Sequence, residues 1–329
     1  MFSAQDQLIE CVPNFSEGRD RKIIEAIGHA IQRVPGVKLM HTDAGYDANR
    51  TVYTFAGRPD AVAEAAFQAI YLAHELIDMS THKGEHPRMG ACDVCPLIPL
   101  RNISMEEVVS VTNKLGKRIG DLGIPVYLYE SSATSHARKS LTYLRKGEYE
   151  EIKNKILLES WKPDFGPQVF NSKFGMMALG ARNFLLAYNI NLNSYDVEAA
   201  REIARRIRTI REKHDGSYES RLFRHVKAIG WWMEEFNCTQ VSTNITDIDS
   251  SPVREVFKTI RRMAEESGIS TNGSELIGLI PRRAFHKDHQ RDEQISRQDI
   301  EEAVQELGLN SLKPFDISER VIEYNLQKD

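Results

Sequence analysis

The sequence predicts an α+β fold made of two ferredoxin-like βαββαβ-type subdomains, with the two sheets facing each other and the helices outside. The chain has 329 residues, which exceeds what one hydrophobic core usually serves. The order strand, helix, strand, strand, helix, strand also occurs twice, and a segment rich in glycine and proline separates the two runs. We therefore expect subdomains at residues 1–184 and 185–329.

The first run begins with LIECVPN as a short strand. Apolar residues at helical spacing from Ile23 to Val34 predict a helix, and VKLMHTD and RTVYTFAG predict a hairpin. A second helix, starting after Pro59 and Asp60, leads through HKGEHPRMG to the strand VCPLIPL. A third helix, with a capping box of Ser104 and Glu107, and the strand IPVYLYE add one more αβ unit to this half.

The second run repeats the order. FLLAYNINL predicts a strand, the spacing from Ala200 to Ile207 a helix, and VKAIGWWM with TQVSTNIT a hairpin. Ser251 and Pro252 occupy N-cap and first-turn positions of a further helix, and ELIGLIP predicts the last strand. Helices on one face of each sheet leave the other face open, so we expect the open faces to cover each other or a ligand.

Composition excludes several classes of protein. The formal charge of −4 comes from 43 basic and 47 acidic residues that are mixed along the chain, so we expect no nucleic acid partner. No apolar run approaches the roughly 20 residues that cross a bilayer, and the N-terminus lacks a secretory pattern, so we expect a cytoplasmic protein without membrane contact. Cys92 and Cys95 have the spacing of half a zinc site, but no second pair completes it, so we expect no metal.

The loop HKGEHPRMG, residues 82–90, is the candidate reaction site. Histidine has an unperturbed pKa of about 6.5, which suits acid–base chemistry near neutral pH. We favour His86 over His82 because Pro87 stiffens the backbone beside it. Asp43 is the expected carboxylate partner of His86, and Glu85 is a rival for that role. A solvated charged loop, with Asp43 as a turn residue, is the alternative interpretation.

Three basic residues in or beside these loops, Arg50, Lys83 and Arg88, indicate a substrate that carries a carboxylate. The junction Trp161–Arg182 is interpreted either as an interdomain linker or as a ligand-binding segment. In the second interpretation, Gly166, Gly175 and Gly180 let the backbone approach the ligand closely. The residues alone leave both interpretations open.

Several stretches together resemble the glutamate formimidoyltransferase family, which is the formiminotransferase part of formiminotransferase-cyclodeaminase. They cover nearly the whole chain, in the family's order: ECVPNFSEG, DAGYDANRTVYTFAG, HKGEHPRMGACDVCPLIP, PVYLYE, RKGEYE, WKPDFGP, GARNFLLAYNINL, QVSTNITD, ELIGLIP and PFDISERVIEY. The resemblance implies a homodimer of chains with two ferredoxin-like subdomains that bind folate between them.

The resemblance also implies roles for residues. The catalytic histidine is His86, and its supporting carboxylate is Asp43. The segment that binds folate is Gly166, Pro167, Gln168, Val169, Phe170, Asn171, Ser172, Lys173, Phe174 and Gly175. The implied reaction transfers the formimidoyl group from N-formimidoyl-L-glutamate to tetrahydrofolate, a co-substrate, in histidine degradation. No deaminase part follows in this sequence, so we expect a separate cyclodeaminase to act on 5-formimidoyltetrahydrofolate.

Two rival functions use the same residues. A hydrolase of formimidoylglutamate would use His86 to activate water and would need no folate. A folate-binding protein without catalysis would use the segment 166–175 and not the histidine loop. Omitting tetrahydrofolate and removing the imidazole of His86 distinguish the three.

Overall fold

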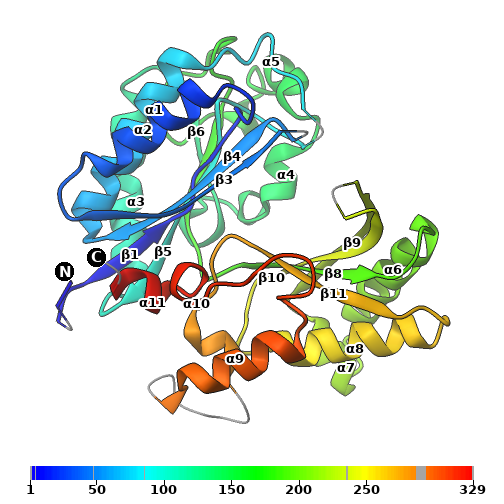
Figure 1. The fold of residues 1–329 in the computed structure, drawn as a ribbon. Helices are drawn as coiled ribbons and strands as arrows, with labels where there is room; N and C mark the ends of the chain where they lie inside the picture. The colour runs from blue at the N-terminus through cyan, green and yellow to red at the C-terminus, as the bar shows by residue number, and fades with distance from the viewer. Residues whose placement is uncertain are drawn as a thin grey trace. The chain divides into compact units, whose positions relative to one another are not determined.

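A computed structural model describes residues 2–3, 5–46, 48–84, 86–234, 236–286 and 294–327. The chain divides into two compact units, Met1–Arg182 and Asn183–Asp329. In each unit, helices pack on one β-sheet, and the fold is α+β (Figure 1). Within the described ranges, no helix combines the length and the apolar composition needed to cross a bilayer.

The sheet of the first unit has the ferredoxin-like strand order that the sequence predicts, with two strands added at one edge. In space the order is β3, β4, the β1–β2 pair, β5, β7 and β6. The strand pairs from β3 to β5 in this order are antiparallel. The pairs β5–β7 and β7–β6 are parallel. The bounds are Leu8–Cys11 for β1, Asn14–Phe15 for β2, Val37–Gly45 for β3, Arg50–Gly57 for β4, Cys92–Arg101 for β5, Val126–Leu128 for β6 and Met177–Ala181 for β7.

The predicted first strand is divided in two. Proline cannot donate to a sheet ladder, and Pro13 stands between β1 and β2, where its carbonyl accepts from Tyr53 N–H at 3.1 Å. Both pieces lie between β4 and β5, so they occupy one position in the sheet. The interruption places Asn14, in β2, next to both β4 and β5.

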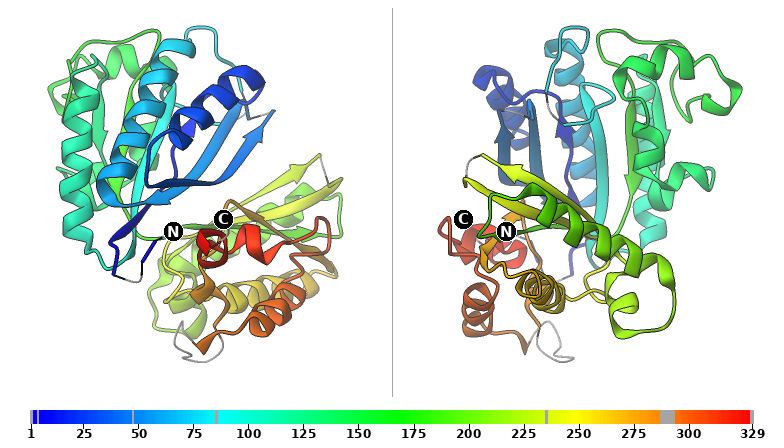
Figure 2. Two further views of the ribbon diagram at one scale, coloured as in Figure 1. Left: turned by 60° about the vertical axis from the view of Figure 1, so that its left-hand side comes forward. Right: turned by 90° about the vertical axis from the view of Figure 1, so that its right-hand side faces the viewer.

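Three helices pack on one face of this sheet (Figure 2). They are α1 (Arg21–Gln32), α2 (Pro59–Leu76) and α3 (Met105–Gly120). Helix α2 begins at Pro59, ahead of the predicted start after Asp60, and the predicted capping box of Ser104 and Glu107 at the start of α3 is confirmed. The apolar spacing of these helices produces the largest core of the unit, in which Phe15, Tyr53 and Phe55 are fully buried.

The junction expected at Trp161–Arg182 contains a strand, β7, and the linker interpretation is wrong for its last third. All five residues of MALGA are buried. A parallel strand covered on both faces lacks the alternation of apolar and polar residues that marks a strand in a sequence. For this reason the sequence pattern does not predict β7 between β5 and β6.

Residues 130–165 cover part of the sheet face opposite α1, α2 and α3. This segment contains two short helices, α4 (Leu141–Arg145) and α5 (Ile152–Lys155), together with several 3₁₀ turns. Its apolar side chains Leu144, Ile152 and Trp161 form a separate small core with Tyr127 and Tyr129 of the β6 region. The segment brings Arg145 to this second face of the sheet.

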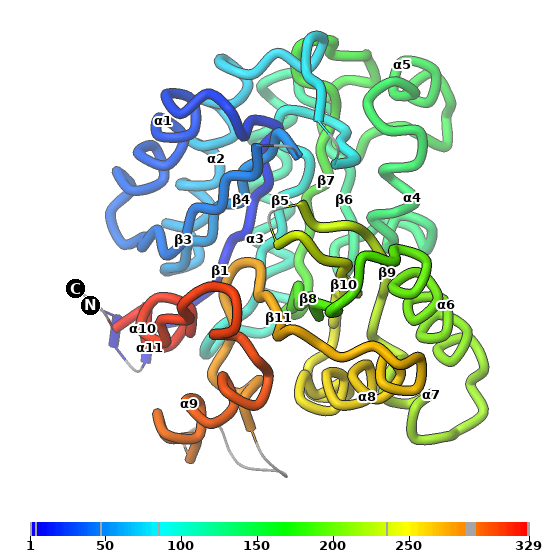
Figure 3. Tube along the Cα trace, turned by 45° about the vertical axis from the view of Figure 1, so that its right-hand side comes forward, coloured from blue at the N-terminus to red at the C-terminus, as the bar shows by residue number. Residues whose placement is uncertain are grey.

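The second unit has a four-stranded antiparallel sheet in the order β11, β8, β10, β9, which is also ferredoxin-like (Figure 3). The sequence predicts its hairpin nearly to the residue. The last strand ends at Ile277 and not at Pro281, because Gly278 takes a left-handed φ of 76°. The strands are β8 (Leu186–Leu192), β9 (Val226–Met233), β10 (Cys238–Ile245) and β11 (Thr271–Ile277).

The helices of the second unit enclose one core with the sheet, and several of them were not predicted. Pro252 is the N-cap of α8, one residue later than expected, while the hydroxyl of Ser251 donates to Leu222 O at 2.6 Å. The helices are α6 (Val197–Lys213), α7 (Tyr218–Phe223), α8 (Val253–Glu265), α9 (Arg297–Glu306), α10 (Ile317–Arg320) and α11 (Ile322–Gln327).

Candidate active site

The histidine loop leaves the C-terminus of α2 and enters β5, and it lies within the first unit. His86 is half-buried there, and its Nδ1 atom is 2.7 Å from Arg50 Nη1 and 2.7 Å from the carbonyl oxygen of Pro87. The predicted proximity of the loop to the β3–β4 hairpin is thus present, through Arg50 at the start of β4. Glu85, the rival carboxylate, lies outside the described residues.

The surroundings of His86 strongly favour the neutral imidazole. Burial lowers its pKa, and the positive charges of Arg50 and Arg145 lower it further, to about 4, against opposing effects from the Pro87 carbonyl and Asp93. A side chain with this pKa is unprotonated at neutral pH. It is therefore available to accept a proton as soon as a substrate offers one.

The two contacts of His86 Nδ1 compete for one atom. A guanidinium N–H only donates and a carbonyl oxygen only accepts, whereas a neutral ring nitrogen either carries a proton or offers a lone pair. When Nδ1–H donates to Pro87 O, the lone pair is on Nε2. When Arg50 donates to Nδ1, the proton is on Nε2. These contacts therefore select between two tautomers of the imidazole.

Asp93 is the buried anion of this site, and sequence reasoning missed it. Its side chain is 1% exposed. One carboxylate oxygen accepts from Met89 N–H at 2.9 Å, and the other faces Arg50 Nη1 at 3.3 Å and Arg145 Nε at 3.1 Å. Burial acts to raise the pKa of Asp93, but the two guanidinium groups outweigh it and hold the pKa below its ordinary value. We call Arg50, Asp93 and Arg145 the charge cluster.

Arg50 uses every nitrogen of its guanidinium group within the protein. Nε donates to Asn14 Oδ1 at 3.0 Å, Nη2 donates to the same oxygen, and Nη1 faces His86 and Asp93. Burial lowers its pKa to about 10, although Asp93 opposes this, so the side chain remains positive at neutral pH. The division of the first strand at Pro13 is what places the Asn14 acceptor here.

The two other predicted carboxylate-binding residues differ in their surroundings. Arg88 donates to Glu150 from Nη1 at 2.9 Å and from Nη2 at 2.6 Å, and its Nη1 also faces Glu148 at 3.1 Å. Its guanidinium is therefore already paired, and it joins the histidine loop to residues 148–150. Lys83 is exposed, and its backbone carbonyl accepts from Asn49 Nδ2 at 3.0 Å; its side chain makes no hydrogen bond or ion pair to the part of the chain that the structure describes.

Asp43 lies inside β3, opposite Val52 of β4, and is half-buried. The strand continues to Gly45, so Asp43 is not the turn residue of the alternative interpretation. Among the residues that the structure describes, no hydrogen bond or ion pair joins Asp43 to His86. The carboxylate with an electrostatic effect on the imidazole is that of Asp93.

The segment 166–175 lies beside the histidine loop, so the structure brings together the two regions that the sequence singles out. Ala91 N–H donates to Phe174 O at 2.8 Å, Met176 N–H donates to Met89 O at 3.1 Å, and Gly90 pairs with Gly175 in an isolated bridge. We call these backbone contacts the seam. The seam fixes the end of the histidine loop without using side chains.

Three glycines of the junction have a role within the protein itself. A Cβ atom on Gly175 would lie 2.2 Å from Met89 O, one on Gly166 would lie 2.2 Å from Ile124 O, and one on Gly180 would lie 2.4 Å from Tyr129 O. Gly166 and Gly175 also have a φ of 82°. These glycines allow close approach of the protein's own backbone, and their close approach to a ligand stays a prediction.

Several side chains of this segment make contacts within the first unit. Gln168 Nε2 donates to Ile156 O at 2.9 Å, Asn171 Oδ1 accepts from Phe174 N–H at 2.9 Å, and Lys173 Nζ donates to Glu75 O at 2.7 Å. Val169 is 64% exposed, whereas Phe174 is fully buried. The backbone of Ser172 accepts from the hydroxyl of Tyr149 at 2.6 Å.

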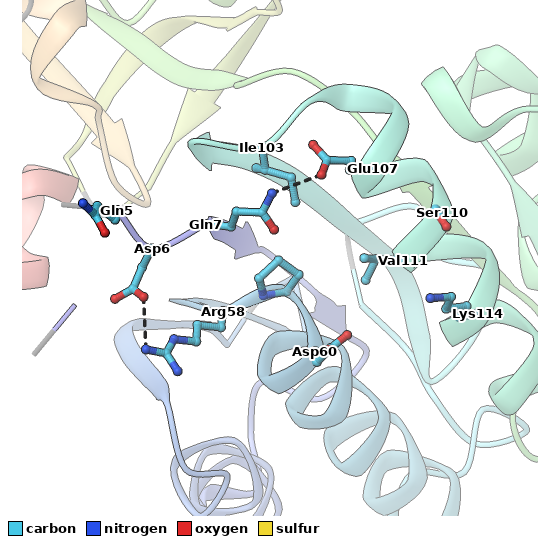
Figure 4. Close-up of a pocket in the computed structure, with 11 residues that line it drawn as sticks. Gln5, Asp6, Gln7, Arg58, Asp60, Ile103, Glu107, Ser110, Val111 and Lys114 are labelled. Carbon is cyan, nitrogen blue, oxygen red and sulfur yellow. Dashed lines mark hydrogen bonds and ion pairs between the residues drawn. The ribbon is translucent and has the colours of Figure 1, made fainter. Parts of the chain in front are cut away.

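A polar cavity of about 460 Å³ in the first unit lies away from this chemistry (Figure 4). It is lined by the N-terminal segment and by the first turns of α2 and α3, and it contains the pairs Arg58–Asp6 and Gln7–Glu107. His86 follows the opposite end of α2, and a helix of 18 residues is about 27 Å long. This cavity is therefore not part of the candidate site.

The described residues contain no group of three or more His, Cys, Asp or Glu side chains that could hold a metal ion. Cys92 and Cys95 are buried in the core of the first unit, and Cys95 Sγ is 3.5 Å from Cys11 Sγ. Burial raises the pKa of Cys92 far above its ordinary value. Cys95 is therefore a buried residue of β5, within the strand predicted from VCPLIPL.

Comparison with known proteins identifies the family. Residues 8–182 match the family described as formiminotransferase domain, N-terminal subdomain, and residues 187–327 match the formiminotransferase domain. The chain belongs to the formiminotransferase family. Together these two matches cover nearly all of the chain, so the resemblance stated from the sequence is confirmed.

Named relatives place the chain among transferases. It is 46% identical, over 98% of its length, to formimidoyltransferase-cyclodeaminase of Gallus gallus, and it spans 60% of the length of that relative. It is 39% identical to glutamate formimidoyltransferase of Streptococcus pyogenes, over 85% of this chain and 91% of the relative. It is 41% identical to glutamate formimidoyltransferase of Thermoplasma acidophilum, over 84% of this chain and 89% of the relative.

Proposed function

We propose that this formiminotransferase family member is a glutamate formimidoyltransferase. It transfers the formimidoyl group from N-formimidoyl-L-glutamate to tetrahydrofolate, giving L-glutamate and 5-formimidoyltetrahydrofolate, as a step of histidine degradation. The observation that carries the proposal is a half-buried neutral histidine beside the charge cluster. Two relatives that this chain covers over about nine-tenths of their length are named glutamate formimidoyltransferase, which supports the same activity. We also propose that the chain works in the cytoplasm as a homodimer, and that a cyclodeaminase acts on its product.

In the proposed reaction, N5 of tetrahydrofolate attacks the amidine carbon of the donor, and a new carbon–nitrogen bond forms. The tautomer with Nδ1–H on Pro87 O leaves the lone pair of His86 on Nε2, where it takes the proton from N5. The imidazolium then returns this proton to the glutamate nitrogen as the old carbon–nitrogen bond breaks. The imidazole is neutral again at the end of the cycle.

Carboxylates support the imidazolium between the two steps. The resemblance assigns this role to Asp43, and we retain Asp43 as a proposed partner that acts once substrates are bound. Asp93 already raises the pKa of His86 through its charge, so we propose that it contributes as well. The segment 166–175 remains the proposed folate segment, because the seam holds it against the histidine loop. The face-to-face arrangement of the two sheets stays a prediction.

The test is consumption of N-formimidoylglutamate by the purified chain with and without tetrahydrofolate. We expect turnover only when tetrahydrofolate is present, with one glutamate released for each 5-formimidoyltetrahydrofolate formed. Turnover without folate would instead assign a hydrolase. Folate binding with no turnover of this donor would leave a binding protein, and the proposed activity would be rejected.

A further inference from the structure

Arg145 reaches the charge cluster from a distant part of the sequence. It is the last residue of α4, 52 positions after Asp93, and the segment 130–165 brings it to the same face of the sheet. Its Nε and Nη2 atoms both donate to one carboxylate oxygen of Asp93. This contact holds the guanidinium in one orientation beside Arg50 and His86.

Arg145 differs from Arg50 and Arg88 because two of its guanidinium nitrogens, Nε and Nη2, contact Asp93, whereas the third, Nη1, is not used in this way. All three guanidinium nitrogens of Arg50 and of Arg88 face acceptors of the protein. Among the described residues, Arg145 Nη1 makes no hydrogen bond. The side chain of Arg145 is 21% exposed, against 1% for Asp93, so this nitrogen can reach a molecule arriving from solvent.

The charges of the cluster do not balance. Asp93 is one carboxylate shared by two guanidinium groups, which leaves one positive charge beside the imidazole. The nearby carboxylates of Glu148 and Glu150 are paired with Arg88. A partly buried positive charge with free N–H donors is suited to a carboxylate, because a guanidinium binds planar oxyanions through directed hydrogen bonds.

We propose that Arg145 binds the α-carboxylate of the formimidoylglutamate donor, and that Asp93 is the positioning residue that orients its guanidinium. The inference rests on the proposed function. The chemistry of the two substrates selects the donor. In N-formimidoylglutamate the α-carboxylate is two bonds from the nitrogen that receives the proton of His86. In tetrahydrofolate, the p-aminobenzoyl group separates the glutamate carboxylates from the reacting N5.

The test compares Arg145→Gln and Arg145→Lys with Lys146→Gln, which removes an exposed positive charge from the adjacent position. We expect Arg145→Gln to raise the KM for N-formimidoylglutamate by about tenfold or more, the usual effect of losing hydrogen bonds to a charged group. The KM for tetrahydrofolate should change much less. The KM of Arg145→Lys for N-formimidoylglutamate should lie between those of Arg145→Gln and the unmodified protein. The KM of Lys146→Gln should equal that of the unmodified protein.

A binding experiment identifies the carboxylate. L-Glutamine keeps the α-carboxylate, whereas L-isoglutamine has an amide there, and both are titrated calorimetrically into each protein. We expect the unmodified protein to bind glutamine more tightly than isoglutamine, and Arg145→Gln to abolish this difference. Equal discrimination by both proteins overturns the proposal. A variant that loses its cooperative unfolding transition is replaced in this comparison by Arg145→Lys.

The outcomes separate this inference from the proposed function. If the unmodified protein transfers the formimidoyl group and Arg145→Gln leaves the KM for the donor unchanged, the inference is overturned and the function stands. If Arg145→Gln raises the KM for tetrahydrofolate but not for tetrahydropteroate, which lacks glutamate, the carboxylate belongs to the acceptor and the assignment to the donor is overturned. If no transfer occurs, the function is rejected, and the two calorimetric titrations still test the site.

Discussion

The imidazole of His86 is partly buried and held between a guanidinium and a carbonyl group. Burial first, and then the positive charge of the guanidinium, make its protonation costly. We predict that His86 titrates with a midpoint of about 4 in the unliganded protein, below the ordinary value near 6.5. Because the pH dependence of kcat/KM reports the base in the free enzyme, kcat/KM should stay level through neutral pH and fall only as the pH decreases toward that midpoint. The midpoint is measured by NMR titration of the His86 ring protons.

Arg145→Gln provides the control for this titration. Removing one nearby positive charge should raise the His86 midpoint, because the charge of Arg145 is one cause of the lowered pKa. A midpoint near 6.5 in the unmodified protein would show that the imidazole is neither buried nor influenced by the charge cluster in solution.

His86→Ala should reduce formimidoyl transfer by about 100-fold or more, the usual contribution of a positioned general base. Tetrahydrofolate binding should be retained, because the segment 166–175 meets the loop through its backbone and not through the imidazole. Steady-state rates and a fluorescence titration with folate measure the two properties. His82→Asn is the matched control from the same loop and should keep most of the rate. Full activity of His86→Ala would remove this residue from the mechanism.

Asp93→Asn should lower the free energy of unfolding by about 3–5 kcal/mol, because it leaves two partly buried guanidinium groups without their counter-charge. Urea unfolding followed by circular dichroism measures this loss. Asp121→Asn, an exposed aspartate at the end of α3, should change stability by no more than about 0.5 kcal/mol. Since the pKa of Asp93 is lowered in the folded protein, its stabilisation should be present above pH 4 and be lost as the pH falls through the folded pKa.

Part of the site was predictable residue by residue. His86 and Arg50 were singled out by residue type and loop position, and they contact each other. Asp93 carried a usable signal, because a charge inside the apolar run ACDVCPLIPL must be paired when the strand is buried. Arg145 carried none, since no local pattern relates it to a strand 52 residues earlier. Fold topology alone brings these two together.

At the level of elements, the seam between residues 166–175 and the histidine loop depends on glycine. We predict that Gly175→Ala destabilises the protein well beyond the roughly 1–2 kcal/mol that a left-handed conformation costs a residue with a Cβ atom, because the new methyl group meets the Met89 carbonyl. Gly216→Ala is the matched control. Its φ is 75°, but no non-adjacent residue within the described ranges has an atom within 4 Å of its Cβ position.

Urea unfolding of the two variants gives the difference. Equal losses of stability would mean that Gly175 is required only for its φ angle and that the seam yields to the extra methyl group. A larger loss for Gly175→Ala, together with reduced transfer activity, is the expected result. The activity should fall because the seam fixes the end of the loop that carries His86.

Elements with one buried face were the predictable ones. The amphipathic helices and the β9–β10 hairpin show their period directly, and the capping box of Ser104 and Glu107 marks the start of α3. Strand β7 and the short helices α4 and α5 were missed. Strand β7 is buried on both faces and so has no alternating pattern. Helices α4 and α5 are stabilised by packing on Tyr127 and Tyr129 more than by their own short sequences.

At the scale of the whole molecule, each unit has a hydrophobic core of its own residues. We predict that Ile119→Ala, in the first unit, raises hydrogen exchange within residues 1–182, and that Ile203→Ala, in the second, raises it within residues 183–329. Each truncation should cost about 2–5 kcal/mol, as is usual for a buried isoleucine. Mass spectrometry of deuterated peptides measures the pattern, and protection lost equally in both units would mean that they unfold as one.

The seam has a consequence for how this family changes over evolutionary time. A junction made of main-chain hydrogen bonds does not depend on which side chains stand beside it, provided that the glycines are kept. Residues 168–173 contribute no side chain to the seam, so substitutions there change only the local hydrogen bonds of Gln168, Asn171 and Lys173 and leave the seam in place. Homologues should vary more at these positions than at the two glycines that close the segment.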